Sequence, residues 1–170
     1  MINIRFCTTE DAALVADMSR QTFYETFASE NSAENMDKFM QTQFSREVLV
    51  KEVGAGGDIF FLAYDDEKPV GYVRMREGDK LPELGNRRTI EIARIYAVMD
   101  SIGKGVGSVL MQKCIEVALE RNKEVIWLGV WEKNKRAIDF YTRWGFEKFS
   151  THVFMLGDDP QTDWLMKKEL

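Results

Sequence analysis

The sequence is poor in the residues from which metal centres and disulfide frameworks are built. Its 170 residues contain two cysteines, Cys7 and Cys114, and one histidine, His152. The cysteines are far apart and belong to no CxxC pair, so their spacing predicts neither a disulfide framework nor a zinc site. His152 has no second ligand with which to hold a metal. We therefore expect no metal site, and a reducing compartment fits the cysteine usage.

The sequence also lacks long apolar runs and a surplus of positive charge. Its longest apolar run, at residues 125–131, is too short to cross a bilayer, and the opening MINIRF has no leader-peptide signature. We expect a cytoplasmic protein without a membrane partner. The 23 Lys and Arg are outnumbered by 28 Asp and Glu, which gives a net charge of −5. This balance argues against nucleic acid as the main partner and suits a cationic substrate better.

Strand and helix patterns alternate along the chain without repeats or linkers, which predicts one mixed α/β domain over residues 1–170. Apolar runs predict strands at residues 2–6, 59–64, 69–76, 89–99, 125–131, 147–156 and 162–167. Helical spacing and capping residues predict helices at about 8–27, 32–39, 45–53 and 137–144, and another that ends near 118. Residues 77–88 are predicted to form a loop. The strand, helix and strand in the middle predict a parallel pair with a right-handed crossover.

Three glycines at alternate positions, Gly103, Gly105 and Gly107, join the central strand to the helix that follows it. Glycine lets the main chain approach a ligand closely and turn several N–H groups toward it. The first turn of the helix adds the positive end of the helix dipole. The stretch therefore predicts a phosphate-binding loop, although a tight turn without a ligand would use the same residues.

Two other phosphate loops do not match this spacing. A dinucleotide-binding GxGxxG requires a glycine where Ser108 stands, and the acid expected at the end of the next strand is Glu124, which precedes that strand. A Walker loop requires a glycine at Val98 and a Ser or Thr after Lys104, which Gly105 follows instead. A nucleotide-binding domain is therefore disfavoured.

A second motif follows the next strand, in the run WEKNKRAIDFYTRWGF at residues 131–146. Together with the glycine loop it resembles the GNAT superfamily of acyl-CoA-dependent N-acetyltransferases, whose motifs are Gln/Arg-x-x-Gly-x-Gly/Ala and Asn-x-x-Ala-x-x-Phe-Tyr-x-x-x-Gly-Phe. The second motif is matched at Asn134, Ala137, Phe140, Tyr141, Gly145 and Phe146. The first is matched at Gly105 and Gly107, but Ile102 stands in place of Gln or Arg, which removes one side-chain contact to the pyrophosphate.

The resemblance implies the GNAT fold: one mixed, mostly antiparallel sheet of about seven strands, with a central parallel pair splayed around the cofactor and helices on both faces. It also implies acetyl-CoA as the cofactor, with CoA as product. The backbone at Ile95, Tyr96 and Ala97 would then pair with the pantetheine arm. The pyrophosphate would be held by the backbone of Gly103, Lys104, Gly105, Val106, Gly107 and Ser108. Asn134 would add a polar contact, and it also suits a helix N-cap.

Acetyl transfer to an amine requires a proton donor for the departing thiolate and a proton acceptor for the ammonium. Tyr141 is the natural donor, because a phenol with a pKa of about 10 is protonated at neutral pH; core packing is its alternative role. Cys114 lies in a predicted helix among apolar residues and Cys7 ends the first predicted strand, so both are interpreted as core and a covalent acyl-cysteine is disfavoured.

We predict Glu91 as the base, because a carboxylate in an otherwise apolar strand is costly unless it is paired or useful. Its position also resembles that of the glutamate base in the histone-acetylating branch of GNAT. Against an alkylamine with a pKa of about 10.4, it would act through a bound water or after burial had raised its own pKa. The alternative is an ion pair with a neighbouring strand. Arg94 is a less suitable partner, because strand parity places it on the opposite face.

Three further segments narrow the resemblance. NSAENM (31–36), IWLGVWEKN (126–134) and GDDPQTD (157–163) resemble the bacterial PaiA-type spermidine/spermine N-acetyltransferases. This implies direct acetyl transfer to a primary amine, most closely a polyamine such as spermidine or spermine. A protein or amino-acid amine as acceptor, and a non-catalytic acyl-CoA-binding regulator, are the alternatives. A homodimer through the last strands is left open.

Acidic residues in two regions could draw a polycation toward the site. Asp158, Asp159 and Asp163 lie in the GDDPQTD turn, and Glu25, Glu30 and Glu34 lie on the predicted N-terminal helices. A solvated acidic helix face is the favoured interpretation of the glutamates, and an Asp-rich turn needs no ligand to explain it. His152, in a late strand, is interpreted as structural.

Overall fold

A computed structural model describes all 170 residues. Its seven strands are β1 (Ile2–Phe6), β2 (Ile59–Asp65), β3 (Lys68–Arg76), β4 (Thr89–Ala97), β5 (Val125–Trp131), β6 (Glu147–Leu156) and β7 (Asp159–Glu169). Its five α-helices are α1 (Ala12–Phe27), α2 (Ala33–Gln41), α3 (Arg46–Glu52), α4 (Val106–Glu120) and α5 (Lys135–Arg143). Short 3₁₀ helices lie at Thr9–Asp11, Ala28–Glu30, Pro82–Leu84 and Met99–Ser101.

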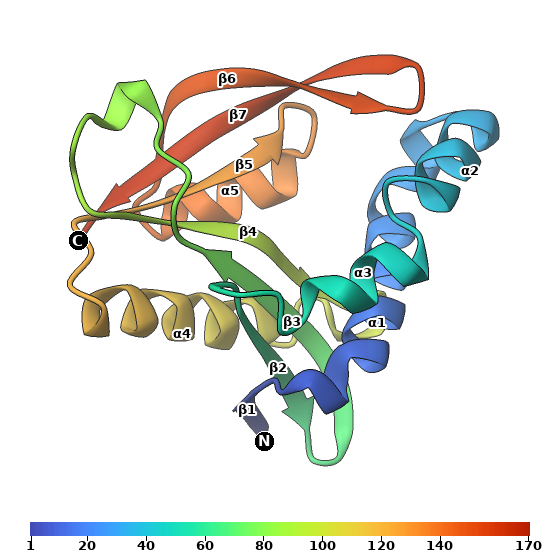
Figure 1. Ribbon diagram of the computed structural model, residues 1–170, viewed down its shortest axis with the longest axis horizontal. Helices are drawn as coiled ribbons and strands as arrows, with labels where there is room; N and C mark the ends of the chain where they lie inside the picture. The colour runs from blue at the N-terminus through green and yellow to red at the C-terminus, as the bar shows by residue number, and fades with distance from the viewer.

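All seven strands form one mixed sheet in the order β1-β2-β3-β4-β5-β7-β6 (Figure 1). Every neighbouring pair is antiparallel except β4 and β5, which run parallel with α4 as their crossover. This confirms the predicted parallel pair. The pairing between β4 and β5 is short, from Thr89 opposite Val125 to Ile92 opposite Leu128. Beyond these residues the two strands have no partner in each other, and the sheet opens between them.

Helices cover both faces of the sheet. Gly71 of β3 faces α4, because a Cβ there would lie 3.0 Å from Leu110 and from Val106. The next residue, Tyr72, points to the other face, toward Ser19 and Thr22 of α1. Phe140 of α5 lies against Gly107 at the start of α4, where a Cβ would be 3.4 Å from its ring. Helices α1, α2 and α3 gather on the side of the sheet opposite α4 (Figure 1). Each strand residue therefore belongs to an α4/α5 face or to an α1–α3 face.

A β-bulge in β4 overturns the parity prediction for Glu91 and Arg94. Arg74 of β3 pairs with Arg94, but the next residue, Met75, pairs with Ile92, so Ala93 is an extra residue in β4. The extra residue reverses the alternation of side chains beyond it. Glu91 and Arg94 consequently lie on the same α1–α3 face. A single sequence does not reveal a bulge, because the residue types around it are ordinary for a strand.

Two other segments differ from the sequence prediction. Strand β7 begins at Asp159 and not near residue 162, because Gly157, with φ of 62°, and Asp158 alone make the turn between β6 and β7. A two-residue hairpin of this kind needs a positive φ. The predicted loop at 77–88 contains the Pro82–Leu84 turn, whose Leu84 is buried against Trp127 in a small cluster.

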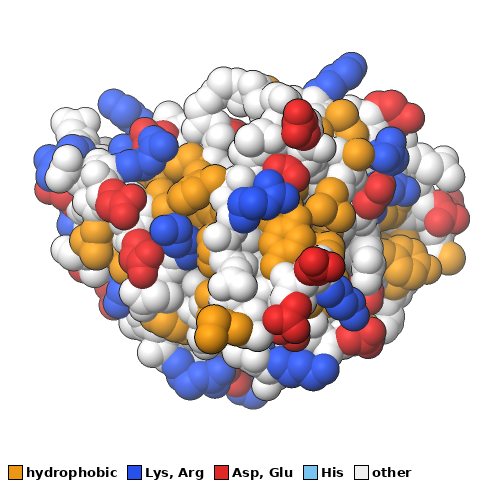
Figure 2. Space-filling model, turned by 90° about the horizontal axis from the view of Figure 1, so that it is seen from below, with side chains coloured by type: hydrophobic (Ala, Val, Ile, Leu, Met, Phe, Trp, Pro, Cys, Tyr) orange, Lys and Arg blue, Asp and Glu red, His pale blue; other side chains and the backbone are white.

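The main hydrophobic core lies between the sheet and its helices, and a second cluster joins α1, α2 and the end of β6. The second cluster is rich in phenylalanine: Phe23, Phe27, Phe39 and Phe44. The surface seen from below in Figure 2 mixes acidic and basic side chains with small apolar areas. No helix has the length and apolar composition required to cross a membrane.

Candidate active site

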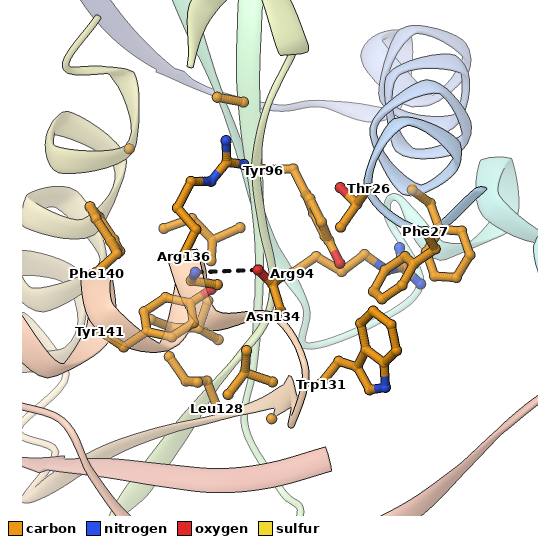
Figure 3. Close-up of a pocket in the computed structure, with 18 of the residues that line it drawn as sticks. Thr26, Phe27, Arg94, Tyr96, Leu128, Trp131, Asn134, Arg136, Phe140 and Tyr141 are labelled. Carbon is orange, nitrogen blue, oxygen red and sulfur yellow. Dashed lines mark hydrogen bonds between the residues drawn. The ribbon is translucent and has the colours of Figure 1, made fainter. Parts of the chain in front are cut away.

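A cavity of about 810 Å³ opens where β4 and β5 separate. Six consecutive residues of β4, from Ile92 to Ala97, line it. Successive strand residues point to opposite faces, so a cavity that touches all six follows the open edge of the strand. It extends to both faces of the sheet: to α4 and α5 on one, and to α1 and α2 on the other (Figure 3).

The N-terminus of α4 presents unpaired backbone donors to this cavity. Gly105 is its N-cap, with φ of 86°, and no side chain caps the helix. The Val109 N–H donates to Gly105 O at 3.2 Å, so the N–H groups of Val106, Gly107 and Ser108 precede the first helical hydrogen bond. These donors and the helix dipole fit a phosphate group.

Of the six loop residues predicted to bind the cofactor, four line this end of the cavity and two do not. Gly103, Gly105, Gly107 and Ser108 line it, and so does Ile102, which is 37% exposed. The side chains of Lys104 and Val106 do not. Lys104 is exposed, and Val106 is buried in the core and so anchors the start of α4. Only their backbone atoms remain available for the predicted contact.

The open edge of β4 supplies the second set of backbone groups. Ile95, Tyr96 and Ala97 all line the cavity, and they lie beyond the last residue of β4 that pairs with β5. Their side facing β5 therefore carries N–H and C=O groups without a partner strand. The amides of a pantetheine arm fit such an edge, as a strand would.

Helix α5 brings one predicted contact and two further cations. The Asn134 side chain accepts a hydrogen bond from the Ala137 N–H at 3.3 Å, which confirms the predicted N-cap (Figure 3). Asn134 also lines the cavity. Arg136 and Arg143 line it too and are exposed. Sequence reasoning missed both, although their spacing from Phe140 placed them on the same face of the helix.

Tyr141 lies at the end of α5 and faces the cavity. Gly145, with φ of 92°, ends the helix: its N–H donates to Thr142 O, and the Phe146 N–H donates to Tyr141 O, each at 3.0 Å. This Schellman arrangement fixes the tyrosine backbone. The side chain is 8% exposed, and burial raises the pKa of its hydroxyl well above the usual value. Tyr141 is therefore a protonated phenol at neutral pH.

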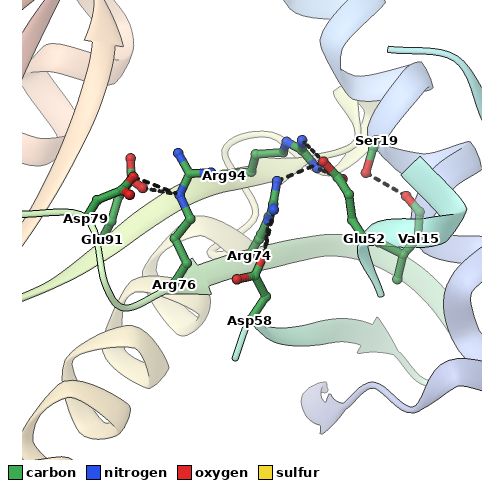
Figure 4. Close-up of polar contacts among 9 residues, drawn as sticks. All are labelled: Val15, Ser19, Glu52, Asp58, Arg74, Arg76, Asp79, Glu91 and Arg94. Carbon is green, nitrogen blue, oxygen red and sulfur yellow. Dashed lines mark hydrogen bonds and ion pairs between the residues drawn. The ribbon is translucent and has the colours of Figure 1, made fainter. Parts of the chain in front are cut away.

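Glu91 lies outside the lining of the cavity. Its carboxylate is buried, 8% exposed, and accepts a hydrogen bond from Arg76 of β3 (Figure 4). Asp79 lies 3.7 Å from the same Arg76 nitrogen. This is the ion pair with a neighbouring strand that the sequence left as the alternative. The base role of Glu91 stays a prediction.

The α1–α3 face of the cavity was not anticipated. It is walled by six aromatic side chains: Phe23, Phe27, Phe39, Phe44, Trp131 and Phe154. Their ring centroids lie 4.5 to 5.7 Å apart along the chain of contacts from Phe27 through Phe23 and Phe39 to Phe154. Asp163 is the single acidic residue of the lining, whereas Glu25, Glu30 and Glu34 do not line it. Phe23 and Phe27 have the helical spacing of core residues, and Phe154 lies in a strand. The pattern of these residues alone gave no signal of a cavity.

The Acetyltransferase (GNAT) family model matches residues 18–146 of the sequence. The chain belongs to the GNAT acetyltransferase family. This GNAT protein is 39% identical over 153 residues to an uncharacterised N-acetyltransferase in the pepI 3′ region of Lactobacillus delbrueckii subsp. lactis. The alignment covers 90% of this chain and 88% of that relative. It is 23% identical over 172 residues to the spermidine N(1)-acetyltransferase of Thermoplasma acidophilum, and this alignment covers 99% of this chain and 97% of that relative.

Solved structures share the fold. The PaiA N-acetyltransferase from Thermoplasma acidophilum in complex with coenzyme A matches with a TM-score of 0.77 at 20% identity, covering 100% of this chain and 99% of that one. A ribosomal-protein-alanine N-acetyltransferase from Brucella melitensis matches with a TM-score of 0.71 at 21% identity, with 99% of each chain covered. The GNAT fold implied by the sequence is confirmed. As a GNAT N-acetyltransferase, the protein uses acetyl-CoA.

Proposed function

We propose that this GNAT enzyme transfers the acetyl group of acetyl-CoA directly to the primary amine of a small molecule, with Tyr141 as proton donor. The observation that carries the proposal is the shared cavity. It joins the free N–H groups at the start of α4, the open edge of β4 and the Tyr141 hydroxyl. Each provides one requirement of the reaction: phosphate binding, thioester positioning and a proton.

Acetyl-CoA supplies an activated acetyl group as a thioester. The residues from Gly103 to Ser108 would hold its pyrophosphate by backbone N–H groups, and Ile95 to Ala97 would align its amide-bearing arm. Asn134 would add a polar contact. The cations of Arg136 and Arg143, at the exposed side of α5, provide further attraction for phosphate.

Tyr141 would donate its hydroxyl proton to the sulfur as the thiolate departs. Burial raises the pKa of Tyr141, whereas a thiol has an ordinary pKa of about 8.5. The phenol therefore stays protonated over the pH range in which the enzyme works, and it is regenerated when the amine nitrogen loses its proton. Glu91 would serve as base only after its ion pair with Arg76 opened.

A polyamine such as spermidine or spermine is our proposed acceptor. The similarity to the Thermoplasma acidophilum spermidine N(1)-acetyltransferase supports it, and so does the net charge of −5. The aromatic wall supports it as well, because π faces attract ammonium groups and the methylenes between them. An amino-acid or protein amine is the alternative acceptor. We place the reaction in the cytoplasm, where Cys7 and Cys114 stay reduced.

The acceptor is identified by a thiol-release assay with acetyl-CoA and a panel of polyamines, amino acids and peptides. We expect CoA release with spermidine or spermine, and N-acetyl product by mass spectrometry. Release with amino acids or peptides alone would replace the polyamine and leave the reaction class intact. No release with any amine, together with tight CoA binding by calorimetry, would favour a non-catalytic acyl-CoA-binding regulator.

Tyr141→Phe tests the proton donor. Because the phenyl ring keeps the packing and loses only the hydroxyl, we expect kcat to fall by about 10²-fold with the calorimetric affinity for CoA unchanged. Tyr24→Phe, the same change at an exposed tyrosine of α1 outside the cavity lining, is the matched control. An unchanged kcat in Tyr141→Phe would remove the tyrosine from the mechanism.

A further inference from the structure

The acid-bearing side of the cavity lies across the sheet from Tyr141. Asp163 of β7 pairs in register with Trp131 of β5, and Trp131 contacts Phe27 of α1 at 5.7 Å between ring centroids. Asp163 therefore belongs to the α1–α3 face, whereas Tyr141 comes from α5 on the other face. Tyr96 of β4 also lines the cavity. Burial is the main cause of the rise in the pKa of its hydroxyl, and both Tyr141 and Asp163 are near enough to add to that rise. A group held in the gap between β4 and β5 would have a phenol on one side and a carboxylate on the other.

Because Gly129 has no side chain, Asp163 is accessible from the cavity. Gly129 lines the cavity on β5 and is exposed. A Cβ at this position would lie 3.4 Å from His152 Cε1 and 3.8 Å from Asp163 Oδ2. Any larger residue would therefore project toward both groups. Glycine at 129 leaves that space open to a small ligand.

Asp163 and His152 form an isolated pair. His152 Nε2 of β6 lies 3.4 Å from Asp163 Oδ2, and no Lys or Arg shares the carboxylate. The Asp163 side chain is 18% exposed and that of His152 is 46% exposed, so the imidazole connects a mostly buried carboxylate to water. Burial raises the pKa of the Asp163 carboxyl, and His152 partly opposes this.

The other groups around Asp163 provide no fixed counter-charge. From β4, Tyr96 is a neutral phenol whose raised pKa includes a contribution from Asp163. Arg94, which also lines the cavity, is held by Glu52 at 2.7 Å. From β5 and α1, Trp131 and Phe27 are uncharged. On β7 itself, the neighbouring lining residue is Gln161, which donates to Asn31 and Asp159. A mostly buried carboxylate in this setting has room for one cation from outside.

We infer that the carboxylate of Asp163 receives the ammonium of the acceptor amine and takes its proton, and that His152 passes this proton to water. This rests on the proposed function. One N–H bond of the ammonium breaks and one O–H bond forms on Asp163; the proton then moves to His152 Nε2, and the imidazole releases a proton to solvent. The products are a neutral amine beside the cavity centre and one proton in water. No further reactant is required.

Removal of the carboxylate is the first test. In Asp163→Asn we expect kcat/KM for the amine at pH 7 to fall by about 10²-fold, with the affinity for CoA unchanged. At pH 9.5 more of the amine is already neutral in solution. The fold-loss in kcat/KM relative to the wild type should therefore shrink to about a tenth of its value at pH 7. Asp37→Asn, an exposed carboxylate of α2 outside the cavity, is the matched control. An equal deficit at both pH values would mean a structural role and overturn the proposal.

Glu91→Gln is compared in the same assay because Glu91 was the base predicted from the sequence. If kcat/KM falls strongly in Asp163→Asn at pH 7 and recovers at pH 9.5, and Glu91→Gln shows no such recovery, Asp163 is supported as the base. The opposite pattern assigns the base to Glu91. The relay is tested by His152→Gln: its rate at pH 7 should fall and recover when imidazole is added to the buffer. A variant as active as the wild type would remove His152 from the proposal.

Binding is tested independently of turnover by proton NMR. Because the chain has one histidine, its ring C–H resonances report on His152 alone. Spermidine added to the wild-type protein should shift them, and it should leave them unmoved in Asp163→Asn, whose folding is checked by circular dichroism. If no amine is acetylated but this shift occurs, the proposed function fails and the ammonium site stands. If spermidine is acetylated without the shift, the function stands and the site is wrong.

Discussion

A single residue, Ile102, separates this phosphate loop from the usual GNAT motif. Its side chain lines the cavity beside the open N-terminus of α4 and is 37% exposed. An apolar side chain there contributes no hydrogen bond to a phosphate, so the phosphate binding that we propose would rest on the backbone N–H groups. The loop is thus complete in its backbone and lacks one charge.

Restoring that charge should tighten cofactor binding. In Ile102→Arg we expect the Kd for CoA to fall by about fivefold, because a charge-assisted contact at a partly exposed position contributes roughly 1 kcal/mol. Ile102→Leu keeps the apolar character and should bind as the wild type does. Calorimetry at low and at 0.5 M salt measures both, and the gain in Ile102→Arg should shrink at high salt. An unchanged Kd would mean that the side chain at 102 does not reach the phosphates.

Residue roles were predictable only where the chemistry is local. Asn134 as N-cap, Gly145 as helix stop and the glycine turn before α4 each depend on a few neighbouring residues, and the structure has these three local features. Phosphate binding by the turn stays a prediction. The surroundings of Asp163 depend on three strands that meet far apart in the sequence. Its partners His152, Trp131 and Gly129 come from β6 and β5, and no spacing rule in one sequence connects them.

At the scale of elements, helix α3 is tied to the sheet by charge. Glu52 at its end accepts hydrogen bonds from Arg94 of β4 at 2.7 and 2.9 Å and from Arg74 of β3 at 2.8 Å (Figure 4). Asp58 accepts a hydrogen bond from Arg74 Nε at 2.7 Å. The Arg and Glu side chains are 13% to 19% exposed. The helix therefore completes a mostly buried ion network beside the cavity.

Loss of one carboxylate from this network should be costly. Glu52→Gln leaves two mostly buried guanidinium groups with too few acceptors, so we expect the free energy of unfolding to fall by about 3 kcal/mol. Glu47→Gln, an exposed carboxylate of the same helix, should change it by less than about 0.5 kcal/mol. Urea denaturation followed by tryptophan fluorescence compares the two. Equal stabilities would show that the network contributes no net stability.

The order of elements was readable from the sequence because strands and helices have different periodicities. The bulge at Ala93 was not, and it decides which side chains of β4 share a face. Likewise, the short pairing of β4 with β5, which creates the cavity, has no signal in the apolar pattern of either strand. Both depend on how the strands pair.

At the scale of the whole molecule, the fold holds both thiols in their protonated form, with Cys7 half-buried and Cys114 buried. Burial raises the pKa of Cys7 to about 12, and it raises the pKa of Cys114, which is fully buried in the main core. At pH 8 Cys7 in the native state is therefore far less ionised than an ordinary thiol. A thiol-release assay with a chromogenic disulfide should consequently detect CoA and not the enzyme.

Native protein at pH 8 should therefore react with that reagent over hours, whereas protein unfolded in guanidinium chloride should release two equivalents within minutes. Saturating CoA should slow the native reaction further if it follows global unfolding, because a ligand that binds only the folded state lowers the unfolded fraction. Fast reaction of one equivalent in the native state would mean that Cys7 is exposed by local opening. The blank rate without acetyl-CoA is the control.

The gap between β4 and β5 lets one cavity reach both faces of the sheet. A nucleotide-like inhibitor bound beside α4 and a cationic inhibitor bound against the aromatic wall would occupy different ends of it. A linker threaded between the separated strands could join them, and each half would then hold the other at a millimolar effective concentration. Two weakly binding fragments joined in this way would form one tightly binding inhibitor. Its selectivity for this enzyme would come from the fragment that contacts the aromatic wall.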